Sequence, residues 1–359
     1  MRYALIGCGR VSPNHINAAR ENGFETAAVC DINAAHIDDM FSRAGWSEAE
    51  TAAPERYSDY EEMLDRVRPE LVSIALPSSL HAGAALCAIE RGINVIIEKP
   101  MAMSIADADR IIEASERRGV TVSACHQNRF NKAVQEMRTA LEKGRFGKIS
   151  HAAVTVRWER GREYYAQGDW RGKWASDGGA LMNQCIHGMD LLRWMCGDEI
   201  ARVYGVTKRS LHDYIEAEDL GMALIEFKNG AVATVEGSVN LPAEMEEHLT
   251  LIGEGGAVKL GGTSANNIEY WRFKDRPEET RDGFHEQTLN VYGNGHASLF
   301  GDVAAAIKEK RPPYVDAYAG KRALETVLAI YKSSFTGEPV ALPLENVSSA
   351  DFEGFFDNK

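Results

Sequence analysis

The fold of this chain is decided near its start, by the stretch Tyr3-Ala4-Leu5-Ile6-Gly7-Cys8-Gly9-Arg10-Val11-Ser12. A short apolar strand runs there into a glycine-rich turn. Gly7 permits the tight turn, and Gly9 lets the backbone approach a pyrophosphate closely. Ser12 and Pro13 are expected to start a helix, as its N-cap and first helical residue. The free amides at that helix start would hold phosphates, so the stretch predicts a dinucleotide-binding βαβ unit.

The residue that follows the second predicted strand indicates which dinucleotide would bind. That strand, Thr26-Ala27-Ala28-Val29-Cys30, runs into Asp31, about 20 residues after the glycines, as the fingerprint requires. Asp31 is expected to accept hydrogen bonds from the adenosine ribose hydroxyls and to repel a 2′-phosphate. No arginine follows it directly, so the sequence favours NAD over NADP. The alternative role for Asp31 is the N-cap of the next helix, and the two roles are compatible.

Short apolar strands alternate with amphipathic helices over the first third of the chain. Strands are expected near residues 2–6, 25–30, 71–76, 93–97 and 120–125, and helices near 13–22, 33–43, 58–67, 80–91 and 104–118. This alternation predicts an α/β fold with a doubly wound parallel sheet. Ligands bind such sheets at the carboxyl ends of the strands. Three of these ends are polar or interrupted by proline, at residues 76–81, 98–100 and 126–129.

A different pattern follows a predicted helix near residues 131–143. Longer alternating segments are expected as strands at 148–158, 200–209, 219–228, 230–239, 246–254, 256–261 and 267–273, with helices near 178–196, 296–309 and 318–334. They predict an α/β domain with an open, mostly antiparallel sheet. We therefore expect a dinucleotide-binding Rossmann domain over 1–127 and a substrate-binding and oligomerisation domain over 128–359. An open sheet needs cover, so a homo-oligomer, either a dimer or a tetramer, is expected to form through it.

The composition narrows the class of protein. With 359 residues the chain is long enough for two domains. Its net charge of −13 argues against nucleic acid as the main partner, because phosphate contacts need a basic footprint. It begins directly with a strand and has no apolar run of membrane-spanning length, so neither a signal peptide nor a membrane partner is expected. Six cysteines without a C-x-x-C pair fit a reducing, cytoplasmic location.

Two motifs carry the expected chemistry: Glu98-Lys99-Pro100 at a strand end, and a helix segment that holds Asn183, His187 and Asp190. The last three residues stand at i, i+4 and i+7, which is one face of a helix. A lysine and a histidine delivered beside a nicotinamide form a proton-transfer site for oxidising an alcohol. Lys99 has an ordinary pKa of about 10.4, and burial beside the positive nicotinamide is expected to lower it. The alternatives are that Lys99 only hydrogen-bonds the sugar or the cofactor ribose, and that His187 is the base.

Residues 157–173 form a locally basic segment, of net charge +2, in an acidic chain. It interleaves Arg157, Arg160, Arg162, Arg171 and Lys173 with Trp158, Tyr164, Tyr165 and Trp170. Arginine forks suit a diphosphate or a carboxylate, and aromatic faces suit a uracil or pyranose ring. The alternative is a solvated charged loop with aromatic residues in the core. No metal site is expected, because neither His126 beside Cys125 nor His187 near Cys185 has the spacing of metal ligands.

Together these motifs resemble the Gfo/Idh/MocA oxidoreductases, in which a Rossmann domain precedes an open-faced α/β domain. The likeness covers essentially the whole chain and rests on Gly7-Cys8-Gly9-Arg10, Glu98-Lys99-Pro100, the H-x-x-D at 187–190 and the domain order. Residues 163–184 and 292–296 are similar to the sugar-nucleotide branch, the UDP-N-acetylglucosamine and UDP-N-acetylglucosaminuronate 3-dehydrogenases. The resemblance implies an NAD-dependent dehydrogenase that oxidises the C3 hydroxyl of a UDP-sugar to a 3-keto sugar. An inositol or free-sugar dehydrogenase of the same family and a non-catalytic NAD-binding regulator are the alternatives.

The resemblance also implies which residues form the site. The catalytic candidates are Lys99, His187, Asn183 and Asp190. The cofactor-binding candidates are Gly7, Gly9, Arg10, Val11, Asp31, Pro77, Ser78, His81, Glu98, Lys99, Gln127, Trp170 and Arg171. The substrate-binding candidates are Lys99, Arg160, Tyr164, Tyr165, Asn183, His187, Asp190 and His296.

One departure from the inositol dehydrogenases of that family bears on the roles. Those enzymes carry an aspartate where this chain has Asn183, four residues before the histidine. An asparagine can fix a tautomer of His187 but cannot stabilise its imidazolium with a full charge, so Lys99 is favoured as the base. His187 would then position the hydroxyl or relay the proton. Asp190 is expected to contact substrate or to support the lysine, and its alternative is an ion pair with Arg193 on the same helix.

Overall fold

The computed structural model describes residues 1–197, 199–288 and 292–357, which form two compact units. The first unit comprises Met1–Ala102, Asp107–His126 and His296–Lys321, and the second comprises Met103–Ala106, Gln127–Gly295 and Arg322–Lys359. The boundary expected after residue 127 lies next to one of these crossings, but residues 296–321 return to the first unit. Ser123 Oγ donates a hydrogen bond to the Val315 carbonyl at 2.7 Å, one of the contacts that hold the returning segment there.

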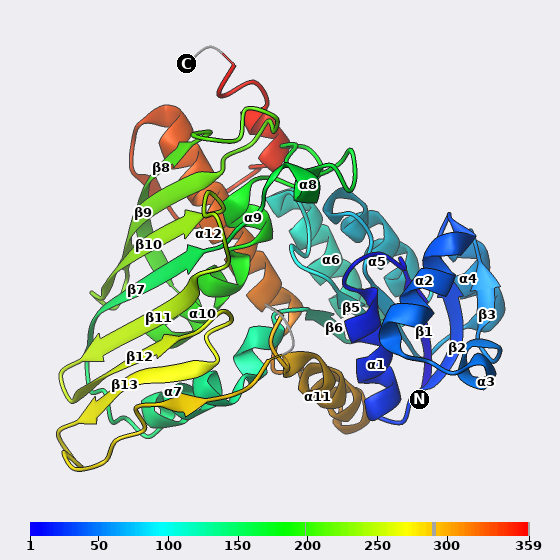
Figure 1. Cartoon of the computed structure of the whole chain (residues 1–359), viewed down its shortest axis with the longest axis horizontal. Coiled ribbons are helices and arrows are strands. Elements are labelled where there is room, and N and C mark those ends of the chain that lie inside the picture. The colour runs from blue at the N-terminus through cyan, green and yellow to red at the C-terminus, as the bar shows by residue number, and fades with distance from the viewer. Residues whose placement is uncertain (198, 289–291, 358–359) are drawn as a thin grey trace. The chain divides into compact units, whose positions relative to one another are not determined.

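The first unit is built on a six-stranded sheet of order β3-β2-β1-β4-β5-β6, in which every pairing is parallel (Figure 1). Its strands are β1 Arg2–Ile6, β2 Glu25–Cys30, β3 Glu55–Tyr57, β4 Leu71–Ile74, β5 Asn94–Ile97 and β6 Val122–Ala124. The doubly wound parallel sheet that the sequence predicts is therefore confirmed. Strand β3 was not predicted, because three partly exposed residues carry no apolar pattern. By contrast, all four residues of β4 are buried, as expected of a strand with both faces covered.

Helices connect these strands as the alternation predicts. They are α1 Ser12–Glu21, α2 Ala34–Ala44, α3 Glu48–Thr51, α4 Tyr60–Val67, η1 Ser78–Leu80, α5 His81–Glu90, α6 Ile105–Arg118 and α11 Gly295–Glu309. Local chemistry sets the bounds of α2: the Asn33 side chain accepts from the Ala35 amide at its start, and Gly45 adopts a left-handed φ of 69° at its end.

The second unit contains a nine-stranded sheet of order β14-β13-β12-β11-β7-β10-β9-β8-β15. Its strands are β7 Ile149–Arg157, β8 Ile200–Lys208, β9 Leu220–Phe227, β10 Val232–Ser238, β11 Glu246–Gly253, β12 Gly256–Gly261, β13 Asn267–Phe273, β14 Phe284–His285 and β15 Val340–Ala341. Among the described strands of this sheet, only β7 and β10 pair in parallel. The predicted mostly antiparallel sheet is therefore confirmed.

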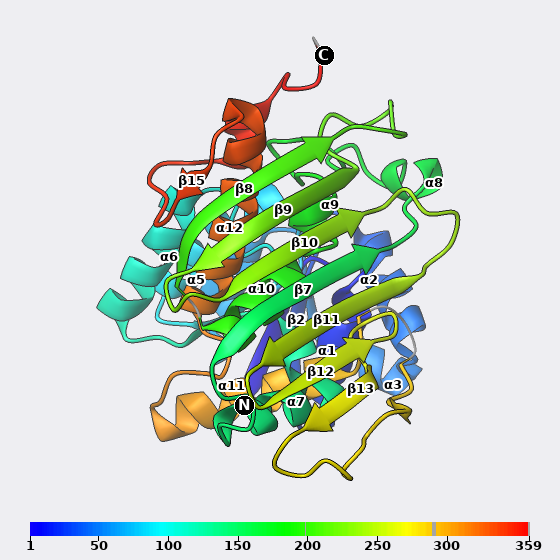
Figure 2. The same ribbon diagram turned by 90° about the vertical axis from the view of Figure 1, so that its left-hand side faces the viewer.

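One face of this sheet is covered by helices, which Figures 1 and 2 show on the same side. The helices of the unit are η2 Gln127–Phe130, α7 Lys132–Glu142, α8 Arg162–Tyr165, α9 Ala180–Asn183, α10 Ile186–Cys196, α12 Ala317–Thr336 and η3 Ser349–Phe352. Helix α10 packs on β7 and β11. Gly188 permits this close approach, because a Cβ atom there would lie 2.8 Å from Val154 Cγ1.

The opposite face of the sheet is turned to the viewer in Figure 2, and none of the described helices lies over it there. Alternating residues of β8, β9, β10 and β13 place apolar side chains on exposed positions. These are Tyr204, Val206, Met222, Leu224, Val232 and Tyr270, each at least 44% exposed. Tyr204 lies opposite Leu224, and Val206 opposite Met222, so the apolar side chains are neighbours across the strands. Self-association through this face stays a prediction.

Candidate functional site

The glycine-rich turn has the geometry that its sequence predicts. Gly7 adopts a φ of 92°, and a Cβ atom there would lie 2.6 Å from the Ala75 carbonyl oxygen, so no other residue fits. At Gly9 a Cβ would meet no atom within 4 Å among the described residues. Internal packing therefore does not explain Gly9, which is consistent with a position kept open for a ligand.

The helix after the turn begins differently from the prediction. Val11 is its N-cap residue, and Ser12 is already helical. The Ser12 hydroxyl donates back to the Gly9 carbonyl at 2.6 Å, so the predicted Ser12 N-cap is wrong. Arg43 also holds the turn, donating to the carbonyls of Gly9 and exposed Arg10 at 3.0 and 3.1 Å. Because no side chain caps α1, its first amides suit a phosphate.

Asp31 braces the same turn. Its Oδ2 accepts from the Cys8 amide at 2.9 Å, and its Oδ1 accepts from the Asn33 amide at 2.9 Å and lies 3.1 Å from His36 Nδ1. Asn33, not Asp31, caps the next helix, so the alternative role of Asp31 as that N-cap is wrong. A carboxylate offers about four acceptor positions, so Asp31 can support the turn and also receive a ribose hydroxyl.

Two further strand ends are tied together by His81. Its Nδ1 lies 2.8 Å from the Pro100 carbonyl, and its Nε2 lies 2.8 Å from the Leu76 carbonyl. Burial lowers the pKa of this imidazole, against the two carbonyls and Glu98, which raise it. The side chain expected to bind the cofactor thus connects two backbone turns. Between them, Pro77 precedes η1 as its N-cap residue and Ser78 is buried.

Lys99 is half-buried at the end of β5, between buried Glu98 and Pro100. Its backbone amide donates to Glu98 Oε2 at 3.1 Å. Glu98, expected to bind cofactor, is only 5% exposed and its other oxygen lies 2.8 Å from His15 Nε2. His296, expected to bind substrate, is also buried, 6% exposed, beside the same carboxylate. Sequence distance hid this arrangement, because His296 lies in the segment that returns to the first unit.

In the second unit the predicted helix over 178–196 is interrupted. Asn183 is the last residue of α9, and α10 starts at Ile186, so Asn183 does not share a helix face with His187. Buried Glu218 fixes the start of α9, accepting from the Leu181 amide at 2.8 Å. The Asn183 amide donates instead to Asp177 Oδ1, and the other Asp177 oxygen accepts from the Gly172 amide.

Asp190 is held by Arg129 in a bidentate pair, with Nε to Oδ2 at 2.7 Å and Nη2 to Oδ1 at 2.6 Å. Its predicted alternative, a pair with Arg193, is wrong, because Arg193 contacts Glu325 at 3.0 Å. At 2% exposure Asp190 is buried and fixes Arg129 within the unit, and its contact with a substrate stays a prediction. His187, one turn earlier on α10, is 4% exposed.

Part of the basic segment forms a cluster, defined here as Tyr164, Arg171 and Gln184. The Tyr164 hydroxyl accepts from Arg171 Nη1 at 2.7 Å and from Gln184 Nε2 at 3.1 Å. The Arg171 guanidinium lies 4.4 Å from the ring centres of both Tyr164 and Trp170. Burial raises the pKa of Tyr164 to about 12. Gln184 was missed by the sequence analysis, since a lone glutamine on a predicted helix carries no signal.

The other arginines of this segment differ from Arg171 in their partners. Arg160 pairs with Glu244, Arg157 with Glu236 and Glu246, and Arg162 with Asp213. Among the described residues, no carboxylate pairs with Arg171. Arg160, which is expected to bind the substrate, is thus already paired with Glu244, and its role in substrate binding stays a prediction. Tyr165 is a core residue, 8% exposed.

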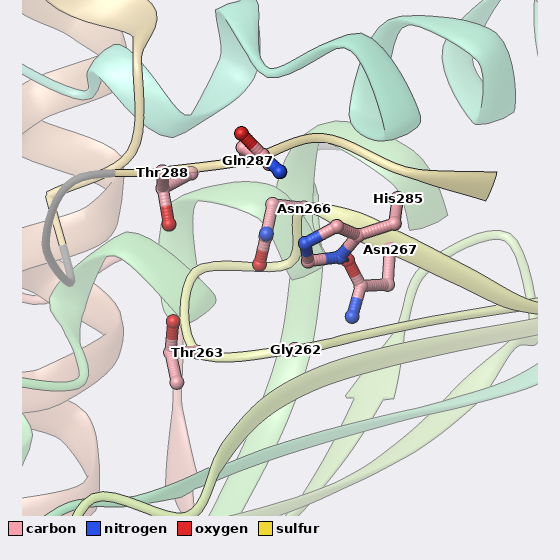
Figure 3. A pocket seen from close by; sticks show the side chains of 7 residues that line it. All are labelled: Gly262, Thr263, Asn266, Asn267, His285, Gln287 and Thr288. Carbon is pink, nitrogen blue, oxygen red and sulfur yellow. Dashed lines mark hydrogen bonds between the residues drawn. The ribbon is translucent and has the colours of Figure 1, made fainter. Parts of the chain in front are cut away.

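Two remaining features lie elsewhere in the second unit. Gln127, a cofactor candidate, is buried and donates to the Tyr292 carbonyl at 3.1 Å. Figure 3 shows an open pocket lined by Gly262, Thr263, Asn266, Asn267, His285, Gln287 and Thr288. None of the predicted site residues lines it. No described helix is both long and apolar enough to cross a membrane.

Known proteins match the chain along its length. Residues 1–126 match the oxidoreductase family with an NAD-binding Rossmann fold, and residues 134–259 match the GFO/IDH/MocA C-terminal domain. The WlbA dehydrogenase from Bordetella pertussis, solved with NADH and UDP-GlcNAcA, is 33% identical, with 96% of this chain and 99% of that chain covered and a TM-score of 0.83. The WlbA dehydrogenase from Chromobacterium violaceum, solved with the same two ligands, is 32% identical, covers 96% of each chain and has a TM-score of 0.84.

The chain is also similar to a protein named as an inositol dehydrogenase. Inositol 2-dehydrogenase 2 from Saccharopolyspora erythraea is 26% identical over 77% of this chain and 78% of its own length. The glycine turn with its bracing aspartate, the two-unit division and the matches over both units agree with one another. The chain belongs to the Gfo/Idh/MocA family, and it is an oxidoreductase whose first unit is an NAD-binding Rossmann domain.

Proposed function

We propose that this enzyme oxidises the C3 hydroxyl of a UDP-N-acetylhexosaminuronate or UDP-N-acetylhexosamine to a 3-keto sugar, with NAD as the hydride acceptor. The observation that carries the proposal is the Tyr164–Arg171–Gln184 cluster, whose guanidinium is paired with no described carboxylate. A cation that the protein itself leaves unneutralised suits an anionic ligand. The similarity to two dehydrogenases solved with UDP-GlcNAcA supports it.

The reaction divides between cofactor and protein. The chemistry that bound NAD would supply is a hydride acceptor for C3. The protein must remove the hydroxyl proton, and we assign this step to Lys99 Nζ, on a side chain that is half-buried and therefore reachable. One O–H and one C–H bond break, a carbonyl forms, and the lysine carries the proton until it is released to solvent.

Residues of the second unit are assigned to binding. His187 would hold the reacting hydroxyl, and Asn183 would contact the sugar while Asp177 fixes its amide. The Arg129–Asp190 pair would act indirectly, as a buried anchor of α10 one turn from His187. We assign these roles because a helix held in place by buried contacts also positions the polar side chains that it carries.

In this proposal the nucleotide part of the substrate is recognised by the aromatic–arginine cluster. Arg171 would bind the diphosphate or the sugar carboxylate with its remaining N–H groups. The rings of Tyr164 and Trp170 would pack on the uracil or the pyranose. Gln184 and Arg171 fix the Tyr164 hydroxyl, so the ring is already positioned before substrate arrives.

The test is NADH formation by the purified enzyme with a panel of UDP-sugars, inositols and free hexoses. We expect a UDP-N-acetyl sugar, with or without the carboxylate, to give the highest kcat/KM. Efficient oxidation of myo-inositol or glucose instead would favour the polyol dehydrogenase, which the similarity to an inositol dehydrogenase makes the second candidate. NAD binding without turnover of any alcohol would favour the regulator.

A further inference from the structure

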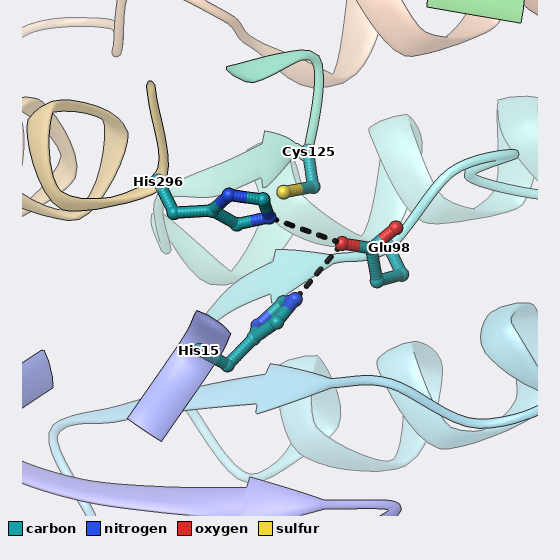
Figure 4. Close-up of side chains that lie close together, drawn as sticks. All are labelled: His15, Glu98, Cys125 and His296. Atoms are coloured by element: carbon teal, nitrogen blue, oxygen red, sulfur yellow. Dashed lines mark hydrogen bonds and ion pairs between the residues drawn. The ribbon is translucent and has the colours of Figure 1, made fainter. Parts of the chain in front are cut away.

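Four potential metal ligands from distant parts of the chain meet inside the first unit. Figure 4 shows His15 of α1, Glu98 after β5, Cys125 after β6 and His296 of α11 pointing toward one another. One ligand atom from each lies within 4.8 Å of all the others. His15 Nε2 is 2.8 Å, and His296 Nε2 is 3.9 Å, from Glu98 Oε1. All four residues are buried, none more than 6% exposed.

Hydrogen bonding within the protein leaves this cluster incomplete. His296 Nε2 is buried and forms an ion pair with Glu98 at 3.9 Å, the dashed line in Figure 4, but at this distance it makes no hydrogen bond to the described residues. A buried polar nitrogen without a partner loses the hydrogen bonds that it makes with water in the unfolded chain. A group bound between the four side chains would satisfy it.

We propose that His15, Glu98, Cys125 and His296 bind one divalent transition-metal ion, with Zn²⁺ as the preferred ion. Imidazole nitrogen, thiolate sulfur and carboxylate oxygen are the donors that zinc takes in tetrahedral sites. One thiolate and one carboxylate offset the two positive charges, so the buried site is neutral overall. Binding replaces the proton of the Cys125 thiol with the metal and releases that proton to solvent.

The dimensions of the cluster suit such an ion. Metal–ligand bonds of about 2.0–2.3 Å place the ligand atoms of a tetrahedron about 3.3–3.7 Å apart. The separations of 2.8 and 3.9 Å at Glu98 Oε1 lie on either side of that range, and all four ligand atoms lie within 4.8 Å of one another, so shifts on the order of 1 Å complete the site. The four protein ligands leave no open position, which makes the ion structural and not catalytic.

The ion would hold the starts of α1 and α11 against the ends of β5 and β6. It would also fix Glu98, whose second oxygen accepts from the Lys99 amide at 3.1 Å. The proposal does not rest on the proposed substrate, because every ligand belongs to the first unit and the test needs no turnover.

The test uses the full chain, treated with a chelator, dialysed and titrated with Co²⁺ as a spectroscopic probe. We expect one equivalent to bind with the intense visible bands of a tetrahedral site and a near-ultraviolet thiolate charge-transfer band. One equivalent of Zn²⁺ should then displace it. Cys125→Ser should abolish the charge-transfer band, and both Cys125→Ser and His296→Gln should weaken binding at least about tenfold.

Cys30→Ser is the matched control, because Cys30 is a buried thiol at the end of β2 in the same sheet, outside the cluster. It should leave the stoichiometry and both band types unchanged. Circular dichroism establishes that each variant is folded, and if Cys125→Ser is not, His296→Gln decides. No stoichiometric cobalt spectrum, or a spectrum that both cluster variants retain, would show a hydrogen-bonded cluster without a metal and overturn the proposal. Loss of UDP-sugar activity has no bearing on these readouts.

Discussion

Lys99 is the residue on which the proposed chemistry depends, and its neighbours show how the chain presents it. It follows a strand whose last three residues are buried, and its amide is held by the Glu98 carboxylate. Pro100, on its other side, is held through its carbonyl by His81. The backbone on both sides of Lys99 is thus fixed by buried polar groups, while the side chain itself is only half-buried.

Replacing Lys99 should separate chemistry from cofactor binding. We expect Lys99→Met to lower kcat by about 10²–10⁴-fold, the usual contribution of a general base, with the NAD dissociation constant nearly unchanged. His187→Ala should lower kcat less, since His187 is assigned a supporting role. Steady-state kinetics and NADH titration by fluorescence provide the measurements. A dead His187 variant beside an active Lys99 variant would reverse the two roles.

Asp31 should set the preference for NAD over NADP. We expect NAD(H) to bind at least about tenfold more tightly, or 1.4 kcal/mol, in calorimetry. Asp31→Asn keeps an oxygen for the Cys8 amide and removes the charge, so it should reduce the difference between the affinities for NAD(H) and NADP(H). Asp31→Ser should also reduce this difference, but it should loosen the turn as well and so weaken the binding of both cofactors. Equal affinities of the parent enzyme for NAD and NADP would contradict the assignment.

Arg171 should control the affinity for the nucleotide part of the substrate. Arg171→Met should raise KM for a UDP-sugar. The rise should correspond to a loss of about 2–5 kcal/mol in binding free energy, the effect of removing one partner of a desolvated charge pair. The effect should fall on KM more than on kcat, because the contact lies away from the reacting carbon. Arg162→Met is the control, since Arg162 is exposed and pairs with Asp213. Equal effects of the two substitutions would show that Arg171 binds no substrate.

At the scale of elements, most strands and long helices were predictable, whereas the short strand β3, the break in the helix predicted over 178–196 and the ends of helices were not. Apolar periodicity located β1, β4 and β5, because strands buried on both faces are continuous apolar runs. The start of α1 depends on a contact with the Gly9 carbonyl and the start of α9 on a contact with Glu218, and neither contact belongs to a periodic pattern.

Strand β11 carries a buried carboxyl group that should make stability depend on pH. Burial raises the pKa of Glu247 to about 8, and the hydrogen bond from Asn128 only partly opposes this. Between about pH 4.3, where an unfolded glutamate titrates, and pH 8, the folded chain carries a proton that the unfolded chain lacks. Unfolding therefore releases a proton, and the free energy of unfolding falls as pH rises through this window.

Glu247→Gln should remove this contribution, which is at most about 1.4 kcal/mol per pH unit. Urea unfolding at several pH values between 5 and 8 measures it, and the variant should gain stability relative to the parent as pH rises. Glu226→Gln, at an exposed carboxylate on β9, should leave the slope unchanged. Glu218, whose pKa burial also raises to about 8, leaves a residual slope of the same sign. An unchanged slope in Glu247→Gln would refute the prediction.

At the scale of the whole molecule, the sequence predicted the two domain types and the strand ends that carry two of the candidate site residues. Asp31 and Lys99 lie where the predicted pattern of strands and turns places them, at the ends of β2 and β5. The ion pair of Arg160 with Glu244 could not be predicted, because Glu244 lies far along the chain. The sequence-based expectation of no metal considered only histidines and cysteines close in sequence, whereas the proposed ligands span residues 15 to 296.

The exposed apolar face of the nine-stranded sheet should support a homo-oligomer. Leu224→Lys places a charge in the middle of this face and should convert a dimer or tetramer into a smaller species, measured by light scattering after size exclusion. Leu211→Lys is the control, because Leu211 is 68% exposed in a loop outside the sheet. A parent enzyme that is monomeric, or an oligomer indifferent to Leu224→Lys, would contradict the prediction.

The return of residues 296–321 to the first unit has a consequence for biosynthesis. Strand β6 is the last strand of its sheet, and the segment around Val315 packs beside it. Translation delivers β6 long before this segment, so the ribosome-bound chain carries an unprotected sheet edge while some 170 residues, from 127 to 295, are still being added. The nucleotide-binding unit is therefore first to be synthesised and among the last to be completed.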